Sequence, residues 1–133
     1  LHGLLAHKAT AENPSRVIST SSVAASGSFP YVFSYGASKA ALEQLTRSLA
    51  ARLVEEHILV NAIAPGLFSS EMSARQARDL GPEFLKQQLE KLPLHRYGEM
   101  ADIAGVAIML CSRAGAYFTG EVLNVDGGYR LVY

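Results

Sequence analysis

The chain has 133 residues, of which 49% are hydrophobic and 18% are charged, so it can bury a core and is not a disordered polypeptide. Twelve Lys and Arg side chains balance twelve Asp and Glu side chains, and the absence of a basic excess argues against a nucleic-acid partner or an anionic membrane surface. The single cysteine, Cys111, excludes an internal disulfide framework and a zinc site built from cysteines.

Hydrophobic periodicity predicts helices that alternate with strands. The longest helix carries four leucines between Leu42 and Leu53 at steps of three and four residues, which predicts one apolar stripe. An apolar run over 58–64 ends at Pro65-Gly66, as expected of a strand buried on both faces of a parallel sheet. No apolar run approaches the roughly 18 residues of a membrane span. In chain order we expect a helix at 1–11, a strand at 16–20, a loop at 21–30, a helix at 34–56, a strand at 58–64, short helices and loops over 67–95, a helix at 101–112 and a strand at 121–125.

This alternation predicts an α/β domain with a parallel sheet. Ligands of such sheets bind beyond the carboxyl ends of the strands. Two segments are expected there, Ser21-Ser22 after the first strand and Pro65-Gly66 after the second. Cys111 falls on the apolar side of the last helix, so we expect it to be buried and inert.

Tyr35 and Lys39 lie four residues apart at the start of the longest helix and therefore share one face. A phenol ordinarily has a pKa of roughly 10, and a nearby ammonium favours the phenolate and lowers that pKa. The pair is thus suited to proton transfer near neutral pH. By itself the spacing also describes a surface Tyr and Lys one turn apart, and Ser22, 13 residues before Tyr35, also fits a capping serine.

Six segments, in order and at matching spacings, resemble the short-chain dehydrogenase/reductase family, and the resemblance covers almost the whole chain. One contains the strand that leads to the family's catalytic serine, a second its Tyr-x-x-x-Lys helix and a third its Pro-Gly turn. The others are similar to its Thr-Glu-Met segment, to the start of its penultimate helix and to its C-terminal strand. The six segments are 17–22, 35–42, 60–66, 70–72, 96–104 and 120–128.

The resemblance implies an NAD(P)-dependent oxidoreductase that transfers hydride between nicotinamide and a ketone or secondary alcohol. Tyr35 would be the general acid or base, and Ser22 would hold the substrate oxygen. Lys39 would lower the pKa of the tyrosine and bind the nicotinamide ribose. The implied cofactor contacts are Tyr35, Lys39, the backbone around Pro65, Gly66 and Phe68, and the hydroxyl of Ser70, which replaces the family's usual threonine.

Two further features concern metals and the substrate. The four histidines are scattered without metal-ligand spacing, so we expect no metal site. Between Pro65 and Pro93 several apolar residues are expected either to line a lid over an apolar or mixed carbonyl substrate or simply to pack their helices. These residues are Phe68, Met72, Leu80, Phe84 and Leu85.

The cofactor-binding part of the family pattern is absent. No G-x-G-x-x-G motif occurs among the eleven glycines, and the family's Asn-Ala-Gly segment is also missing. We therefore expect residues 1–133 to be the catalytic, C-terminal half of a doubly wound, Rossmann-like domain whose N-terminal half is absent. That N-terminal half is the first partner that we expect for this chain. Alone it should expose a sheet edge and an apolar helix face, bind the dinucleotide poorly and be inactive.

The single cysteine favours a reducing compartment, so we expect a cytoplasmic protein. The resemblance further implies a homo-oligomer, a tetramer first and a dimer second, associating through the long helix and the segment 129–133. Two other functions remain open. A catalytically inactive member could serve as a binding or oligomerisation subunit, although the presence of Ser22, Tyr35 and Lys39 argues against it. A serine hydrolase using Ser22 ranks far lower, because no G-x-S-x-G elbow surrounds that serine.

Overall fold

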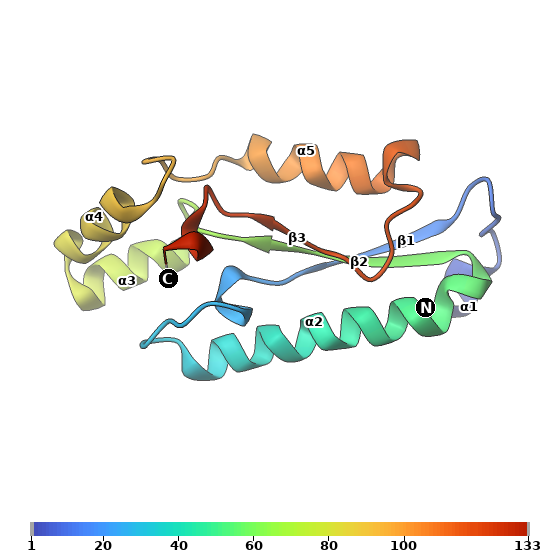
Figure 1. Cartoon of the computed structure of the whole chain (residues 1–133), viewed down its shortest axis with the longest axis horizontal. Coiled ribbons are helices and arrows are strands. Elements are labelled where there is room, and N and C mark those ends of the chain that lie inside the picture. The colour runs from blue at the N-terminus through green and yellow to red at the C-terminus, as the bar shows by residue number, and fades with distance from the viewer. Residues whose placement is uncertain (1, 133) are drawn as a thin grey trace.

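A three-stranded parallel sheet, in the order β1-β2-β3, forms the centre of the computed structural model (Figure 1). The structure describes residues 2–132, apart from the side chains at 2, 4, 72, 76 and 82. This arrangement confirms the predicted α/β class. The strands are β1 (Ser15–Thr20), β2 (Ile58–Pro65) and β3 (Val122–Val125), and the helices are α1 (His2–Ala6), α2 (Phe33–Leu53), α3 (Glu71–Leu80), α4 (Pro82–Lys91) and α5 (Met100–Cys111).

The predicted first helix is too long. The helix ends at Ala6, and Leu1 lies outside the described residues. Beyond it, the amide of Asn13 donates to Thr10 Oγ1, and the amide of Thr10 donates to the Asn13 carbonyl. Such local bonds offer the backbone an alternative to the helix.

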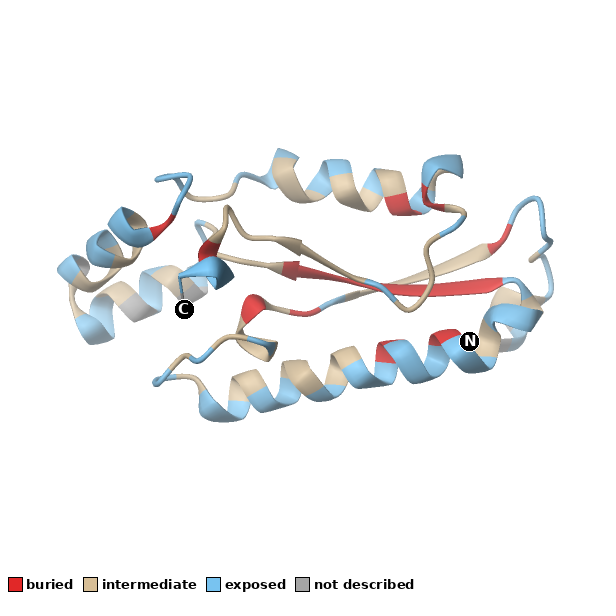
Figure 2. Ribbon diagram, viewed as in Figure 1, coloured by how far each residue is buried: buried red, intermediate tan, exposed pale blue. Residues whose placement is uncertain are grey.

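The middle strand forms the core of the sheet. Every residue of β2 from Ile58 to Ala64 is buried, because strands pair with both of its edges and helices lie over both of its faces (Figure 2). The buried polar exception is Asn61. Its amide nitrogen donates to the Phe118 carbonyl at 2.8 Å, and its amide oxygen accepts from the Glu121 N–H at 3.0 Å. Asn61 therefore fixes the chain just before β3.

The helices α2 and α5 cover opposite faces of the sheet (Figure 1). Neighbouring residues of β1 reflect this arrangement: Val17 packs into the core cluster that contains Ala50 of α2, whereas Arg16 donates to the Ser112 carbonyl at the end of α5. The connection from β1 to β2 and the connection from β2 to β3 both move in the same direction across the sheet. Because their helices lie on opposite faces, the two connections have opposite handedness. One of them is therefore left-handed, whereas connections between parallel strands are usually right-handed.

The apolar stripe predicted for the four leucines of α2 is not the face that is most deeply buried. Thr46 and Ala50 face the sheet and are almost fully buried, whereas Leu45 and Leu49 are 51% and 37% exposed. Thr46 can occupy this position because its hydroxyl donates to the Leu42 carbonyl one turn earlier. The small side chains bring α2 close to β2 and leave two leucines on its outer side.

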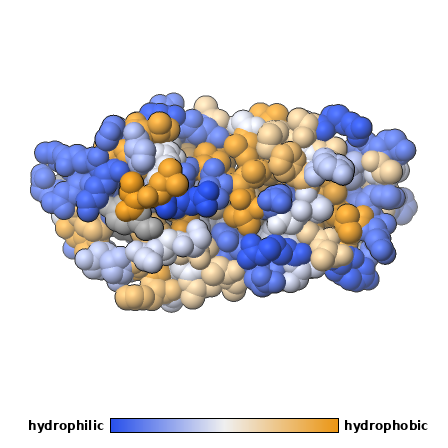
Figure 3. Space-filling model, in the orientation of Figure 1, coloured by the Kyte–Doolittle hydropathy of each residue, from blue (hydrophilic) through white to orange (hydrophobic). Residues whose placement is uncertain are grey.

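The outer side of α5 is also apolar. Leu110 is buried, but Met100 and Ile108 are largely exposed. Cys111, predicted to be buried, is exposed, because it follows Leu110 by about 100° around the helix and lies towards the side of Ile108. Further hydrophobic residues gather along the middle of the face in Figure 3, where the sheet lies between the two helices. No helix in the described part of the chain is long and apolar enough to cross a membrane.

Candidate active site

One cavity of about 550 Å³ lies at the carboxyl ends of β1 and β2. Its walls come from the turn after β1, the first turns of α2, the segment after β2, the helices α3 and α4, and the C-terminal segment. All seven residues proposed for the site from the sequence line it, namely Ser22, Tyr35, Lys39, Pro65, Gly66, Phe68 and Ser70.

Ser22 lies directly beyond β1, where it caps a short 3₁₀ turn (Val23–Ala25). Its hydroxyl oxygen accepts from the Ala24 N–H at 3.2 Å, which leaves the hydroxyl proton able to donate into the cavity. Val23 is buried in a core cluster with Leu92 and Tyr129 and so anchors this turn. Ser22 can therefore cap this turn and still offer its hydroxyl proton to the cavity.

Tyr35 and Lys39 are half-buried on the first turns of α2 and face the same cavity. The Lys39 ammonium lies 5.6 Å from the centroid of the Tyr35 ring and donates to the Thr20 carbonyl at 2.8 Å. This hydrogen bond fixes a positive charge between the phenol and the end of β1. Such a charge stabilises negative charge that develops on the phenol oxygen.

The turn after β2 is held against β3. The Gly66 N–H donates to the Val125 carbonyl at 2.9 Å, and a Cβ on Gly66 would lie 2.6 Å from the Asp126 Cα. The close approach explains the glycine. Because the Gly66 N–H is already used within the sheet, a ligand at this turn must be bound by other groups.

Ser70 is the N-cap of α3. It accepts from the Ser73 N–H at 3.2 Å, while Ser73 Oγ accepts from the Ser70 N–H at 2.9 Å. This reciprocal capping starts the helix at the rim of the cavity. A helix N-terminus there favours a polar or anionic group.

Aromatic residues from three segments form much of the remaining wall. Tyr31, from the loop after β1, meets Phe84 of α4 edge to face, with ring centroids 5.8 Å apart. Phe29 stacks on Tyr129 at 5.3 Å, and the Tyr129 hydroxyl donates to Gln88 Oε1. Sequence analysis missed the contributions of Phe29, Tyr31 and Tyr129. A distinguishing signal was lacking, since an aromatic residue in a loop carries no periodicity.

The apolar residues expected to form a lid are only partly at the cavity. Phe68, Leu80 and Phe84 line it, whereas Leu85 is half-buried elsewhere. The Met72 side chain lies outside the described residues. Leu80 and Phe84 make part of the inner side of α3 and α4 apolar, and polar side chains of α4 follow them along the cavity, namely Gln87, Gln88 and Lys91.

Comparison with known proteins identifies the family. A family model described as Enoyl-(Acyl carrier protein) reductase matches residues 4–130. The chain belongs to the short-chain dehydrogenase/reductase family. It is 48% identical over 129 residues to the rhamnolipids biosynthesis 3-oxoacyl-(acyl-carrier-protein) reductase of Pseudomonas aeruginosa, covering 96% of this chain and 50% of that protein.

Other members show the same partial coverage. The chain is 43% identical over 99 residues to the galactitol 2-dehydrogenase (L-tagatose-forming) of Cereibacter sphaeroides, covering 74% of this chain and 38% of the relative. The solved RhlG/NADP active-site complex of Pseudomonas aeruginosa matches with a TM-score of 0.86 at 48% identity, over 96% of this chain and 49% of the other. The chain therefore spans about half the length of the Pseudomonas aeruginosa relative and of its solved structure.

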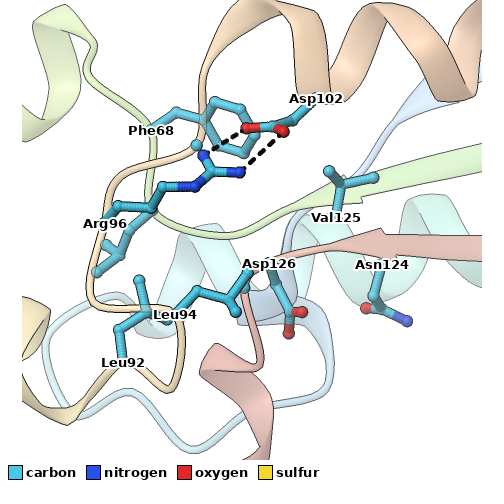
Figure 4. Close-up of a pocket in the computed structure, with 11 residues that line it drawn as sticks. Phe68, Leu92, Leu94, Arg96, Asp102, Asn124, Val125 and Asp126 are labelled. Atoms are coloured by element: carbon cyan, nitrogen blue, oxygen red, sulfur yellow. Dashed lines mark hydrogen bonds and ion pairs between the residues drawn. The ribbon is translucent and has the colours of Figure 1, made fainter.

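A second cavity of about 290 Å³ in this short-chain dehydrogenase/reductase chain lies between β3 and the start of α5. Figure 4 shows the Arg96 guanidinium paired directly with the Asp102 carboxylate in its lining, with Nη1–Oδ2 and Nη2–Oδ1 distances of 2.8 and 3.1 Å. Phe68 lines both cavities, so the segment after β2 separates them. Arg96 and Asp102 neutralise each other, and we assign the candidate active site to the cavity lined by Ser22, Tyr35 and Lys39.

The Arg96–Asp102 pair predicts an acid-dependent contribution to stability. The hydrogen bond from Arg96, followed by that from the Glu99 backbone, lowers the pKa of Asp102 to about 2 from its ordinary 3.8. Because the folded-state pKa is depressed, this contribution is present above pH 3.8 and is lost as the pH falls through about 2. We expect Arg96→Met to raise the Asp102 pKa part of the way to 3.8, as measured by a carbon-13 NMR titration of its carboxyl group.

The matched control is Arg78→Met on the exposed surface of α3, which should leave the Asp102 titration unchanged. An Asp102 pKa that is the same in the Arg96→Met and Arg78→Met proteins would refute the role of the ion pair.

Proposed function

We propose that the protein carrying this chain is an NAD(P)-dependent oxidoreductase that interconverts a ketone and a secondary alcohol. The observation that carries the proposal is the meeting of Ser22, Tyr35 and Lys39 around one cavity at the carboxyl ends of two parallel strands. A hydroxyl donor, a phenol and a cation beside it are the groups that proton transfer to a carbonyl oxygen requires.

Each of these side chains has a distinct task in the reduction. The Ser22 hydroxyl donates to the carbonyl oxygen and orients it, since its own oxygen is held by the Ala24 amide. Tyr35 transfers its phenol proton to that oxygen as negative charge develops there. Lys39 stabilises the resulting phenolate from its fixed position beside the Thr20 carbonyl. In the reverse direction Tyr35 accepts the alcohol proton.

The donor set of the cavity fits a nicotinamide ribose. The Lys39 ammonium has three N–H groups, and its bond to Thr20 O leaves others for ribose hydroxyls. Ser70, at the N-terminus of α3, offers a hydroxyl to the carboxamide or to a phosphate. NADPH or NADH supplies the hydride when bound. The NADP complex of the Pseudomonas aeruginosa relative supports NADP as the first choice.

The isolated residues 1–133 are proposed to be inactive. This chain contains no glycine-rich loop that could seat the pyrophosphate, and its relatives are about twice as long. We infer that it is the catalytic half of one Rossmann-like domain, which works together with the preceding half.

The shape of the cavity favours a ketone with an extended apolar tail. A carbonyl at Ser22 and Tyr35 would place the rest of the substrate along Phe29, Tyr31 and Phe84. The name of the Pseudomonas aeruginosa relative specifies a 3-oxoacyl substrate, which has such a tail. A 3-oxoacyl compound therefore fits this aromatic wall better than a sugar does.

Phe84→Ala should reduce activity in proportion to substrate chain length. Removing the ring opens the wall opposite Tyr31, so we expect kcat/KM for a 3-oxo substrate with a ten-carbon tail to fall about tenfold. The value for a four-carbon substrate should change less than twofold. Steady-state kinetics of the full-length protein measure both, with exposed Glu83→Gln as the control. Equal losses for the two substrates would place the tail elsewhere.

The test of the function itself is NADPH or NADH oxidation by the full-length protein with a panel of ketones, together with cofactor binding followed by nicotinamide fluorescence. Saturable oxidation with at least one ketone is expected. Cofactor binding without turnover of any ketone or alcohol would instead support the inactive, scaffolding family member.

We also propose that the full-length protein is a homo-oligomer, a tetramer before a dimer. The exposed Leu45 and Leu49 give α2 an outer apolar surface suited to another subunit. In the C-terminal segment, Leu131 is largely exposed, and Tyr133 lies outside the described residues. Light scattering at several concentrations measures the mass of the assembly.

A further inference from the structure

We propose that Glu43 of α2 is a positioning residue for the active site. Its carboxylate holds Ser21 and thereby fixes the turn that presents Ser22 to Tyr35. The inference rests on the proposed function, in which Ser22 and Tyr35 act on the same carbonyl oxygen.

Glu43 shares a helical face with the catalytic pair. It lies four residues beyond Lys39 and eight beyond Tyr35, so the three side chains follow one another at successive turns. Ser21 Oγ donates to Glu43 Oε1 at 2.8 Å. Ser21 is only 2% exposed, and Glu43 is half-buried. A hydrogen bond to a carboxylate that is shielded from water in this way is stronger than one between neutral groups.

Two consecutive residues at the end of β1 are thus bound by two consecutive turns of α2. The Thr20 carbonyl accepts from Lys39, and the Ser21 hydroxyl donates to Glu43, both at 2.8 Å. The Ser21 N–H also donates to the Ile63 carbonyl of β2 at 2.7 Å. The last residue before Ser22 is therefore tied to the helix through its side chain and to the sheet through its backbone.

These ties determine how the Ser22 turn faces Tyr35. The Lys39 bond alone holds one carbonyl group and leaves rotation about the following residue unrestrained by the helix. The Glu43 bond restrains that residue as well. Losing it should misplace Ser22 relative to Tyr35 and slow the chemical step, while Lys39 still binds the ribose.

The test uses the full-length protein. We expect Glu43→Ala to lower kcat at least tenfold, counted per cofactor-binding site, with the cofactor Kd changed less than twofold. Ser21→Ala removes the same bond from the other side and should give a similar loss. The double variant should be no slower than either single variant. Glu43→Gln keeps an acceptor oxygen at this position and should stay within about threefold of the unmodified enzyme.

Gln44→Ala is the matched control, because Gln44 is the next residue of α2 and its side chain points to Ser48 and Arg47 on the exposed surface. It should retain full activity. Normalising kcat to cofactor-binding sites separates positioning from loss of folded protein. If Glu43→Ala fails to fold, Ser21→Ala carries the same test. Equal kcat values in the Ser21→Ala or Glu43→Ala protein and the Gln44→Ala protein would overturn the inference.

A measurement without turnover distinguishes this inference from the proposed function. The NMR signal of carbon-13 at the Tyr35 ring Cζ, assigned by its loss in Tyr35→Phe, should move in Glu43→Ala and Ser21→Ala but not in Gln44→Ala. If the unmodified protein reduces no ketone, the proposed function fails, and this comparison still decides the structural role of Glu43. An unmoved Tyr35 signal in both variants overturns it.

Discussion

Tyr35→Phe is expected to lower kcat of the full-length protein by about 10² to 10⁴, the range that general acid–base catalysis contributes. The variant removes one oxygen and keeps the ring beside which the Lys39 ammonium lies, 5.6 Å from its centroid. Cofactor binding should therefore change little. Steady-state kinetics give kcat, and fluorescence titration of the reduced nicotinamide gives the cofactor Kd.

The control for this variant is Tyr117→Phe, which removes the same atom from a fully exposed tyrosine far along the chain. It should leave both quantities unchanged. A Tyr35→Phe protein that retains more than a tenth of the unmodified kcat would rule out Tyr35 as the proton donor. A protein whose biological role survives the substitution would indicate a scaffold.

Asn61→Ala should lower the free energy of unfolding by about 2–4 kcal/mol, because it leaves the Phe118 carbonyl and the Glu121 N–H without their partner at a buried position. It also creates a small cavity in the middle strand. Urea denaturation of the full-length protein, followed by circular dichroism, measures the change.

Asn61→Asp provides the second arm of this experiment. It preserves the size of the side chain and the acceptor for Glu121, but it cannot donate to Phe118 and it buries a charge. The expected loss is at least as large as for Asn61→Ala. Losses below about 1 kcal/mol in both variants would show that Asn61 does not hold the approach to β3.

The sequence predicts the strands and the central residues of the cavity well because these signals are local. Ser22 lies two residues beyond the first predicted strand, Pro65 directly follows an apolar run, and Tyr35 and Lys39 belong to one helix. Parallel strands place their carboxyl ends at one edge of a sheet, so these separate signals converge without knowledge of distant contacts. These local signals, together with the parallel arrangement of the strands, are enough to place the seven predicted residues at one cavity.

Side-chain direction depends on tertiary packing and was harder to predict. Leu45 and Leu49 have the spacing of a buried stripe, but the close approach of α2 to β2 selects Thr46 and Ala50 instead. Cys111 is likewise one residue from the buried Leu110 and yet exposed. A helix that is apolar on several sides does not show in its sequence which side meets the sheet.

The bond between Ser21 and Glu43 illustrates a second limit. Its partners are 22 residues apart and belong to different elements. Nothing in either local pattern connects a serine at a strand end with a glutamate in the middle of a helix. Only the relative placement of β1 and α2 makes the pair visible.

The change of face between α2 and α5 has a consequence for how substrate preference can evolve. After β2 the chain does not go straight to α5 on the other face: it first runs through α3 and α4 beyond the carboxyl ends of the strands, and both helices line the cavity. The two helices that cover the cavity are thus part of the connection between β2 and α5, and not a separate insertion into the fold. Insertions or replacements along this route can remodel what enters the cavity, while the strand register and the residues proposed to transfer the proton stay where they are.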